Sequence, residues 1–83
     1  MKEKYKRVVA IRDSNEEVIN IYGYGDYVGD YPCPILGGYP NPQINLDNGK
    51  TVWGCQCWWG DLEKFEKEMV GDRKVIVVPL EEN

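Results

Sequence analysis

All three tryptophans and two of the three cysteines of this chain lie within the eight residues from Trp53 to Gly60. Cys55 and Cys57 stand two positions apart, so their thiolates, with Cys33 as a third ligand, could bind a soft metal such as zinc. The chain has no histidine and no C-x-x-C pair, and the fourth ligand of a zinc site would have to be a carboxylate. We therefore expect no bound metal and interpret the cysteines as reduced thiols that pack as small apolar side chains.

The residue types also argue against catalysis. A catalytic cysteine is normally activated by a histidine, which the chain lacks. Turn formation and helix capping account for the aspartates that lie beside glycines or turns, namely Asp26, Asp30, Asp47 and Asp61. The sequence thus predicts a non-catalytic protein without a cofactor.

Aromatic stacking is the chemistry that remains. Because side chains alternate along a strand, the residues of the tryptophan segment divide between two faces. The face that we expect to join the core carries Trp53, Cys55, Cys57 and Trp59. The other face carries Trp58 beside Gln56. Core packing therefore does not explain why residue 58 is a tryptophan.

A glycine-rich run from Tyr22 to Gly29 adds further rings. If this run is a strand, Tyr22 and Tyr24 share a face, and the glycines between them leave room for a flat ligand or a partner. The candidate ligand- or partner-binding residues are Tyr24, Tyr27, Tyr39, Trp58 and Gln56, with Lys50 and Arg73 as partners for phosphate oxygens. The alternative is that the tyrosines pack across a sheet with their hydroxyls at the surface.

Length and charge limit the classes of function. The 83 residues suit one domain with a thin core, because a chain of this size buries only about 60% of its unfolded surface. A net charge of −4 disfavours binding to extended nucleic acid or to anionic membranes. No run approaches the roughly 20 apolar residues of a membrane span. The odd number of cysteines favours a reduced, cytoplasmic protein.

Two hairpins can be predicted from local patterns. Residues 7–12 and 18–22 are β-branched runs on either side of a polar turn. Residues 44–46 and 51–53 flank Asn48-Gly49, the strongest short signal for a hairpin turn. Gly23 and Gly25 follow the second strand, where they mark a bulge or a close approach of another backbone or a ligand.

The other elements follow from proline, glycine and apolar spacing. Four prolines and two adjacent glycines predict a long ordered loop over residues 29–43. Apolar spacing and a capping aspartate predict a helix over 62–70 that lies across the sheet. Residues 74–78 form a last strand, which the helical crossover could place parallel to its neighbour, and residues 81–83 form a frayed tail. The expected fold is a single small α+β domain at 1–83, with a largely antiparallel sheet of about five strands covered by one helix.

Residues 23–30 and 46–60 carry a pattern that resembles small phage- or prophage-encoded proteins of unassigned function. The resemblance covers residues 23–60, about half of the chain. It implies a setting, the cytoplasm of a bacterial host, and for proteins of this kind a role against host defence.

Three hypotheses follow. In the first, the aromatic and glycine-rich surface sequesters a small nucleotide-like signal, helped by assembly into a homo-oligomer in which loop 29–43 of one subunit meets the aromatic strand of another. In the second, the same surface is a protein-interaction module or an inhibitor of a host protein. In the third, the chain is a structural, oligomer-forming phage component.

Overall fold

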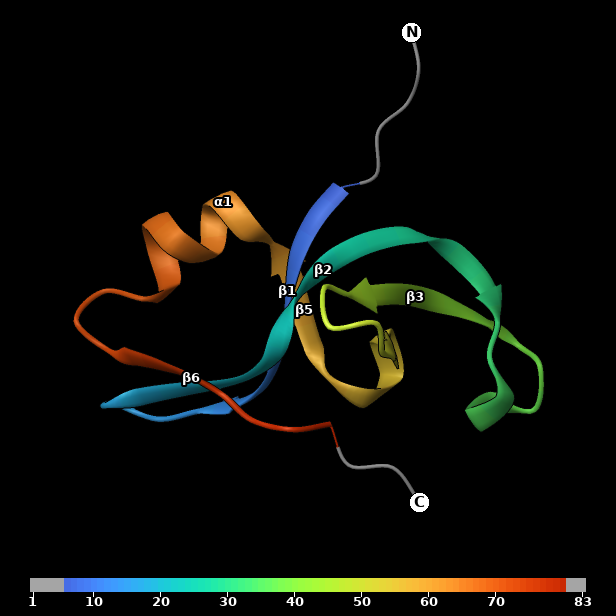
Figure 1. The fold of residues 1–83 in the computed structure, drawn as a ribbon, viewed down its shortest axis with the longest axis horizontal. Coiled ribbons are helices and arrows are strands. Elements are labelled where there is room, and N and C mark those ends of the chain that lie inside the picture. The colour runs from blue at the N-terminus through green and yellow to red at the C-terminus, as the bar shows by residue number, and fades with distance from the viewer. Residues whose placement is uncertain (1–5, 81–83) are drawn as a thin grey trace, which may run out of the picture.

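The computed structural model describes residues 6–80, which form one six-stranded sheet and a short helical segment (Figure 1). The strands are β1 (Lys6–Ser14), β2 (Val18–Pro32), β3 (Pro40–Leu46), β4 (Thr51–Trp53), β5 (Trp58–Asp61) and β6 (Lys74–Val77). The sheet order is β4-β3-β2-β1-β5, and β6 pairs with β2. The predicted α+β class, with a largely antiparallel sheet and one helix, is confirmed. The predicted tail 81–83 lies outside the described residues.

The β1–β2 hairpin is present, and its turn is closed by a side chain. The Asn15 Oδ1 atom accepts hydrogen bonds from the backbone N–H groups of Glu17 (2.7 Å) and Val18 (2.9 Å). This local use of an amide oxygen explains why the polar run after Ser14 reverses the chain.

Both interpretations of the glycines after this hairpin hold. The register steps from Ala10 opposite Gly23 to Ile11 opposite Ile21, so Tyr22 is the extra residue of a bulge. At Gly25 the β3 backbone comes close to β2, because a Cβ atom on Gly25 would lie 2.3 Å from the Asn45 carbonyl oxygen. The predicted shared face of Tyr22 and Tyr24 is wrong, since the bulge directs the two rings to different hydrophobic clusters.

β2 is long enough, at 15 residues, to have two partners in succession on the edge that faces away from β1. Its first residues, Val18–Ile21, pair in parallel with β6, and Gly25–Pro32 pair antiparallel with β3. The parallel orientation of the last strand is therefore confirmed.

The proline-rich stretch is shorter as a loop than the sequence predicts. β2 runs to Pro32 and β3 begins at Pro40, so the predicted loop 29–43 is reduced to residues 33–39, which include a 3₁₀ turn, η1 (Pro34–Leu36). β4 pairs only with Gln43–Asn45, which leaves the start of β3 as an edge on that side. Prolines are tolerated at such an edge because no ladder hydrogen bond is needed there.

The helical segment consists of α1 (Leu62–Lys64) and a π-helical turn, η3 (Phe65–Met69). It agrees with the predicted 62–70 to within one residue. Asp61 caps it, with its Oδ2 atom accepting from the Lys64 N–H at 3.1 Å, and Gly71 follows with a φ of 54°. No helix within residues 6–80 has the length and apolar character that crossing a bilayer requires.

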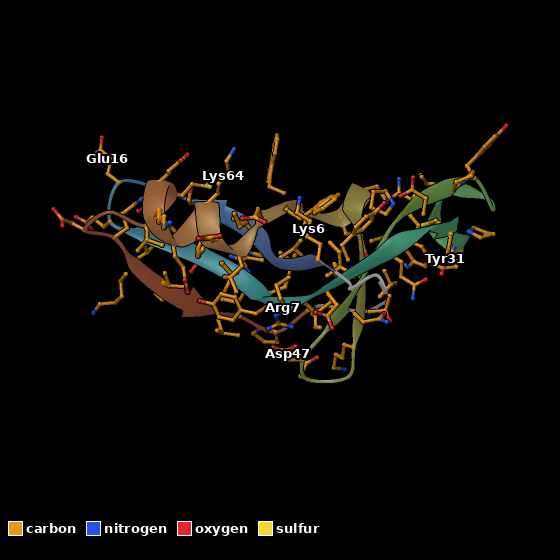
Figure 2. The ribbon with its side chains drawn as sticks, turned by 90° about the horizontal axis from the view of Figure 1, so that it is seen from above. Lys6, Arg7, Glu16, Tyr31, Asp47 and Lys64 are labelled. Carbon is orange, nitrogen blue, oxygen red and sulfur yellow. The ribbon has the colours of Figure 1, made fainter. Side chains whose placement is uncertain are left out.

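Hydrophobic residues are buried on both faces of β1. Val8 and Ala10 belong to one cluster, with residues of β3 and β4, and Val9 and Ile11 belong to another, with Phe65 of the helical segment. Figure 2 shows the helical segment with Lys64 on one side of the strands and Asp47, in the β3–β4 turn, on the other. The molecule therefore has two small cores, one on each face of β1. It is thin, measuring 19 Å along its shortest axis.

Candidate binding surface around Trp58

The tryptophan segment is not one continuous strand. A 3₁₀ turn, η2 (Gly54–Gln56), separates β4 from β5, and it is closed by the Gln56 Oε1 atom, which accepts from the Trp53 N–H at 2.9 Å. The predicted alternation therefore fails inside the segment, and Cys55 is exposed instead of joining the core.

Beyond the turn, Trp58 and Trp59 have opposite environments. They pair with Ile11 and Ala10 of β1, so they point to opposite faces. Trp59 stacks on Tyr27, with ring centroids 5.0 Å apart, and packs against the first cluster. Trp58 is 76% exposed. The expectation that Trp58 has no place in the core is confirmed.

The exposed indole forms a wall of an apolar groove between β5, β1 and the helical segment. We call this the Trp58 groove; its volume is about 270 Å³. Its apolar lining comes from Val9, Ile11, Trp58, Trp59, Gly60, Phe65 and Met69, and its polar lining from Asp61, Lys64 and Glu68. The groove exists because Phe65 anchors the helical segment on β1 at 1% exposure, whereas Met69, one turn later, remains 42% exposed.

The charge around the Trp58 groove is negative on balance. Asp61 and Glu68 contribute two carboxylates and Lys64 one ammonium group. The remaining lysine of the helical segment, Lys67, is paired with Glu63 at 3.1 Å. An apolar occupant that carries a positive charge would therefore suit this groove better than an anionic one.

A second hollow shares the Trp58 side chain and is more polar. Its volume is about 270 Å³, and its lining residues are Arg12, Cys55, Gln56, Cys57 and Trp58. The Nε atom of Arg12 donates to the Asp13 carboxylate at 2.9 Å. Trp58 and Gln56 are the two predicted site residues that the structure brings together.

The other predicted site residues line neither hollow. Besides stacking on Trp59, Tyr27 donates its hydroxyl to Asp30 at 2.8 Å, an interaction that raises the pKa of the phenol. Tyr24 packs against the second cluster. A separate hollow of about 190 Å³ lies beside the bulge and is lined by Tyr22, Gly23, Tyr24, Leu46, Asp47, Asn48 and Val77.

The predicted phosphate-binding cations and Tyr39 are also dispersed. Tyr39 is 71% exposed in the β2–β3 connection. Lys50 follows the β3–β4 turn, where its N–H donates to Asn48 at 2.9 Å. Arg73 donates to the carbonyl oxygens of Asn15 and Met69, which ties the end of the helical segment to the first hairpin.

The weak metal candidates do not form a metal site. Among residues 6–80, no three histidine, cysteine, aspartate or glutamate side chains gather closely enough to hold an ion. Cys33 is buried, as expected for a thiol that packs as an apolar side chain, whereas Cys57 is half-buried and Cys55 is exposed.

An ion-pair network is centred on Arg7, a residue that the sequence did not single out. The Arg7 guanidinium donates to both Asp47 carboxylate oxygens, at 2.9 and 2.8 Å, and to Asp26 at 3.0 Å (Figure 2). Asp47 and then Asp26 raise the pKa of Arg7, and the Arg7 hydrogen bonds lower that of Asp47. No local pattern predicts this network, because Arg7 and Asp47 are 40 residues apart.

Comparison with known proteins adds no relative: no protein-family model, curated protein or solved structure matches the chain. Function is therefore inferred from the surface of the described residues.

Proposed function

We propose that this chain is a non-catalytic binding protein whose binding site is the Trp58 groove, and that its ligand is an apolar segment of a partner protein. One observation carries the proposal: Trp58 is 76% exposed and forms the wall of an apolar groove. Tryptophan is among the residues most enriched at binding hot spots, because it buries a large area at a small cost in conformational entropy.

The groove also indicates the chemistry of its occupant. The apolar lining favours aliphatic or aromatic side chains, and the two carboxylates against one ammonium group favour a neighbouring lysine or arginine. The partner segment that fits best therefore combines a large apolar residue with a basic one.

Selection of short random peptides on the immobilised protein tests this proposal. Selected peptides should be rich in apolar residues next to lysine or arginine. In calorimetric titrations they should bind the wild type and the control Tyr39→Ala, which loses a similarly exposed ring elsewhere. Trp58→Ala should bind about 30-fold more weakly or worse, since one buried face of the indole is worth about 2 kcal/mol. Equal affinity for Trp58→Ala would refute the site.

A nucleotide-like signal is the second candidate, and the polar hollow supports it. There Arg12 and Gln56 line the same hollow as Trp58, a combination that suits a base with an attached phosphate. Calorimetry with a panel of cyclic and ADP-ribose-derived nucleotides separates the two candidates. If a nucleotide gives binding heat with the wild type but not with Arg12→Gln or Trp58→Ala, the ligand is a nucleotide. If no nucleotide gives binding heat, the ligand is a partner protein.

The setting of this activity is a further part of the proposal. The resemblance of residues 23–60 to small phage-encoded proteins supports an anti-defence role in the cytoplasm of a host cell, through a blocked host protein or a sequestered signal. The proposal includes a homo-oligomer in which a second subunit extends the groove, whereas a structural, oligomer-forming phage component is a separate, third hypothesis. Light scattering of the purified protein measures the subunit number directly.

A further inference from the structure

Cys33 occupies a fixed position at the end of β2. Its N–H donates to the Tyr39 carbonyl at 3.0 Å, and its own carbonyl accepts from the N–H groups of Leu36 (3.0 Å) and Gly38 (2.9 Å). The side chain is fully buried. A reagent in solution therefore has no direct access to the Cys33 thiol.

Cys55 is held beside the same end of the β2–β3 hairpin, although it lies 22 positions further along the chain. Its N–H donates to the side chain of Asn41 at 2.8 Å, and Asn41 pairs with Tyr31, two residues before Cys33. The adjacent Gly54 packs closely on Pro42 of β3. Unlike Cys33, Cys55 is exposed.

The Cys33 side chain is a neighbour of the Cys55 thiol. Desolvation raises the pKa of Cys55, and a hydrogen bond with Cys33 and the charge of the Cys33 thiolate raise it further. Cys57 differs, because its thiol donates to the Trp53 carbonyl at 3.7 Å and burial raises its pKa to about 11. The charge of Cys55 also raises the pKa of Cys57, so both sulfurs lie near Cys55. A Cys55–Cys57 bond would close a strained, very short ring, and Cys33 is therefore the sulfur suited to bond with Cys55.

We propose that Cys33 and Cys55 form a modification site, a pair of thiols that is converted to an intramolecular disulfide by a low-molecular-weight disulfide such as oxidised glutathione. The Cys55 thiolate attacks one sulfur of glutathione disulfide, which forms a mixed disulfide and releases one glutathione thiolate. Cys33 then loses its proton and attacks the Cys55 sulfur, which releases the second. The protein loses two protons and two electrons, and glutathione disulfide is reduced to two thiols.

Burial determines the order of these steps. Because Cys33 is inaccessible and Cys55 is exposed, Cys55 reacts first and Cys33 resolves the mixed disulfide. The raised pKa keeps the Cys55 thiolate scarce near neutrality, so the rate should rise about tenfold per pH unit below that pKa. The bond would join the β2–β3 end to turn η2 and raise the melting temperature by roughly 15–25 °C.

Incubation of the reduced protein with oxidised glutathione, followed by digestion with trypsin without reductant, tests the proposal. Cleavage after Lys50 separates Cys33 from Cys55 and Cys57, so mass spectrometry reports a disulfide as two linked peptides, about 2 Da below their summed mass. We expect this link in the wild type and in the control Cys57→Ser, and its absence in Cys55→Ser.

Three results would overturn the proposal. The first is a glutathione adduct on Cys55 that persists without the link. The second is a link in Cys55→Ser, which would place the bond on Cys57, and the third is a covalent dimer in place of the internal bond. Because Cys55 is exposed, Cys55→Ser should fold even if a Cys33 variant does not.

Discussion

Replacing each neighbouring tryptophan by alanine should separate the exposed Trp58 from Trp59, which is partly buried and packs against the core. A buried tryptophan covers roughly 150–250 Å². Trp58 is 76% exposed, which leaves about a quarter of its area in contact. At 25 cal/mol per Å², the loss in Trp58→Ala is therefore about 1–1.5 kcal/mol of unfolding free energy. Trp59 stacks on Tyr27 and packs against the first cluster, so Trp59→Ala should cost about 3–4 kcal/mol.

Urea denaturation followed by far-ultraviolet circular dichroism measures both losses without relying on tryptophan fluorescence. A protein of this size has an m-value of about 1 kcal/mol per M, so the midpoints of the two variants should differ by about 2 M. If Trp58→Ala lowers the midpoint as much as Trp59→Ala, Trp58 is a core residue and the argument for an exposed site fails.

Three further changes test the fold. Gly25→Ala should cost about 3 kcal/mol or more in urea denaturation, because its Cβ would lie 2.3 Å from a β3 carbonyl oxygen, whereas the control Gly60→Ala, with open space, should cost little. Phe65→Ala should cost about 3–4 kcal/mol, against less than about 0.5 for the exposed neighbour Glu66→Ala; equal losses would contradict the anchoring role of Phe65. Asp47 has a lowered pKa when folded, so its contribution is present above the unfolded pKa of about 3.9 and is lost as pH falls through the folded value. Wild type and Asp47→Asn should therefore differ by at most about 1 kcal/mol near neutral pH and converge in acid, and a difference that grows in acid would contradict this sign.

Elements with a local chemical signal were predictable from the sequence. Asn48-Gly49 between two apolar runs specified the β3–β4 hairpin, and Asp61 with the apolar spacing after it specified the helical segment. The exposure of Trp58 followed from alternation along β5, which the structure retains over Trp58 and Trp59.

Features that depend on distant neighbours were not predictable. A loop was predicted at Pro32 and Pro40, because the sequence does not show that these two residues pair with each other at the end of a hairpin. The η2 turn depends on Gln56 bonding back to Trp53, and on Gly54 fitting against Pro42, and neither contact has a recognisable pattern.

The most direct test of the binding surface is an NMR titration of the isotope-labelled protein with a small aromatic probe such as indole. Small-molecule sites are mostly apolar clefts with a few polar groups, so a small aromatic probe is suited to test this groove. We expect shifts of the Trp58 indole N–H and of the backbone amides of Gly60, Lys64 and Met69, which line the groove. Shifts confined to the hollow beside Tyr22 and Tyr24, or no shifts at all, would contradict this expectation.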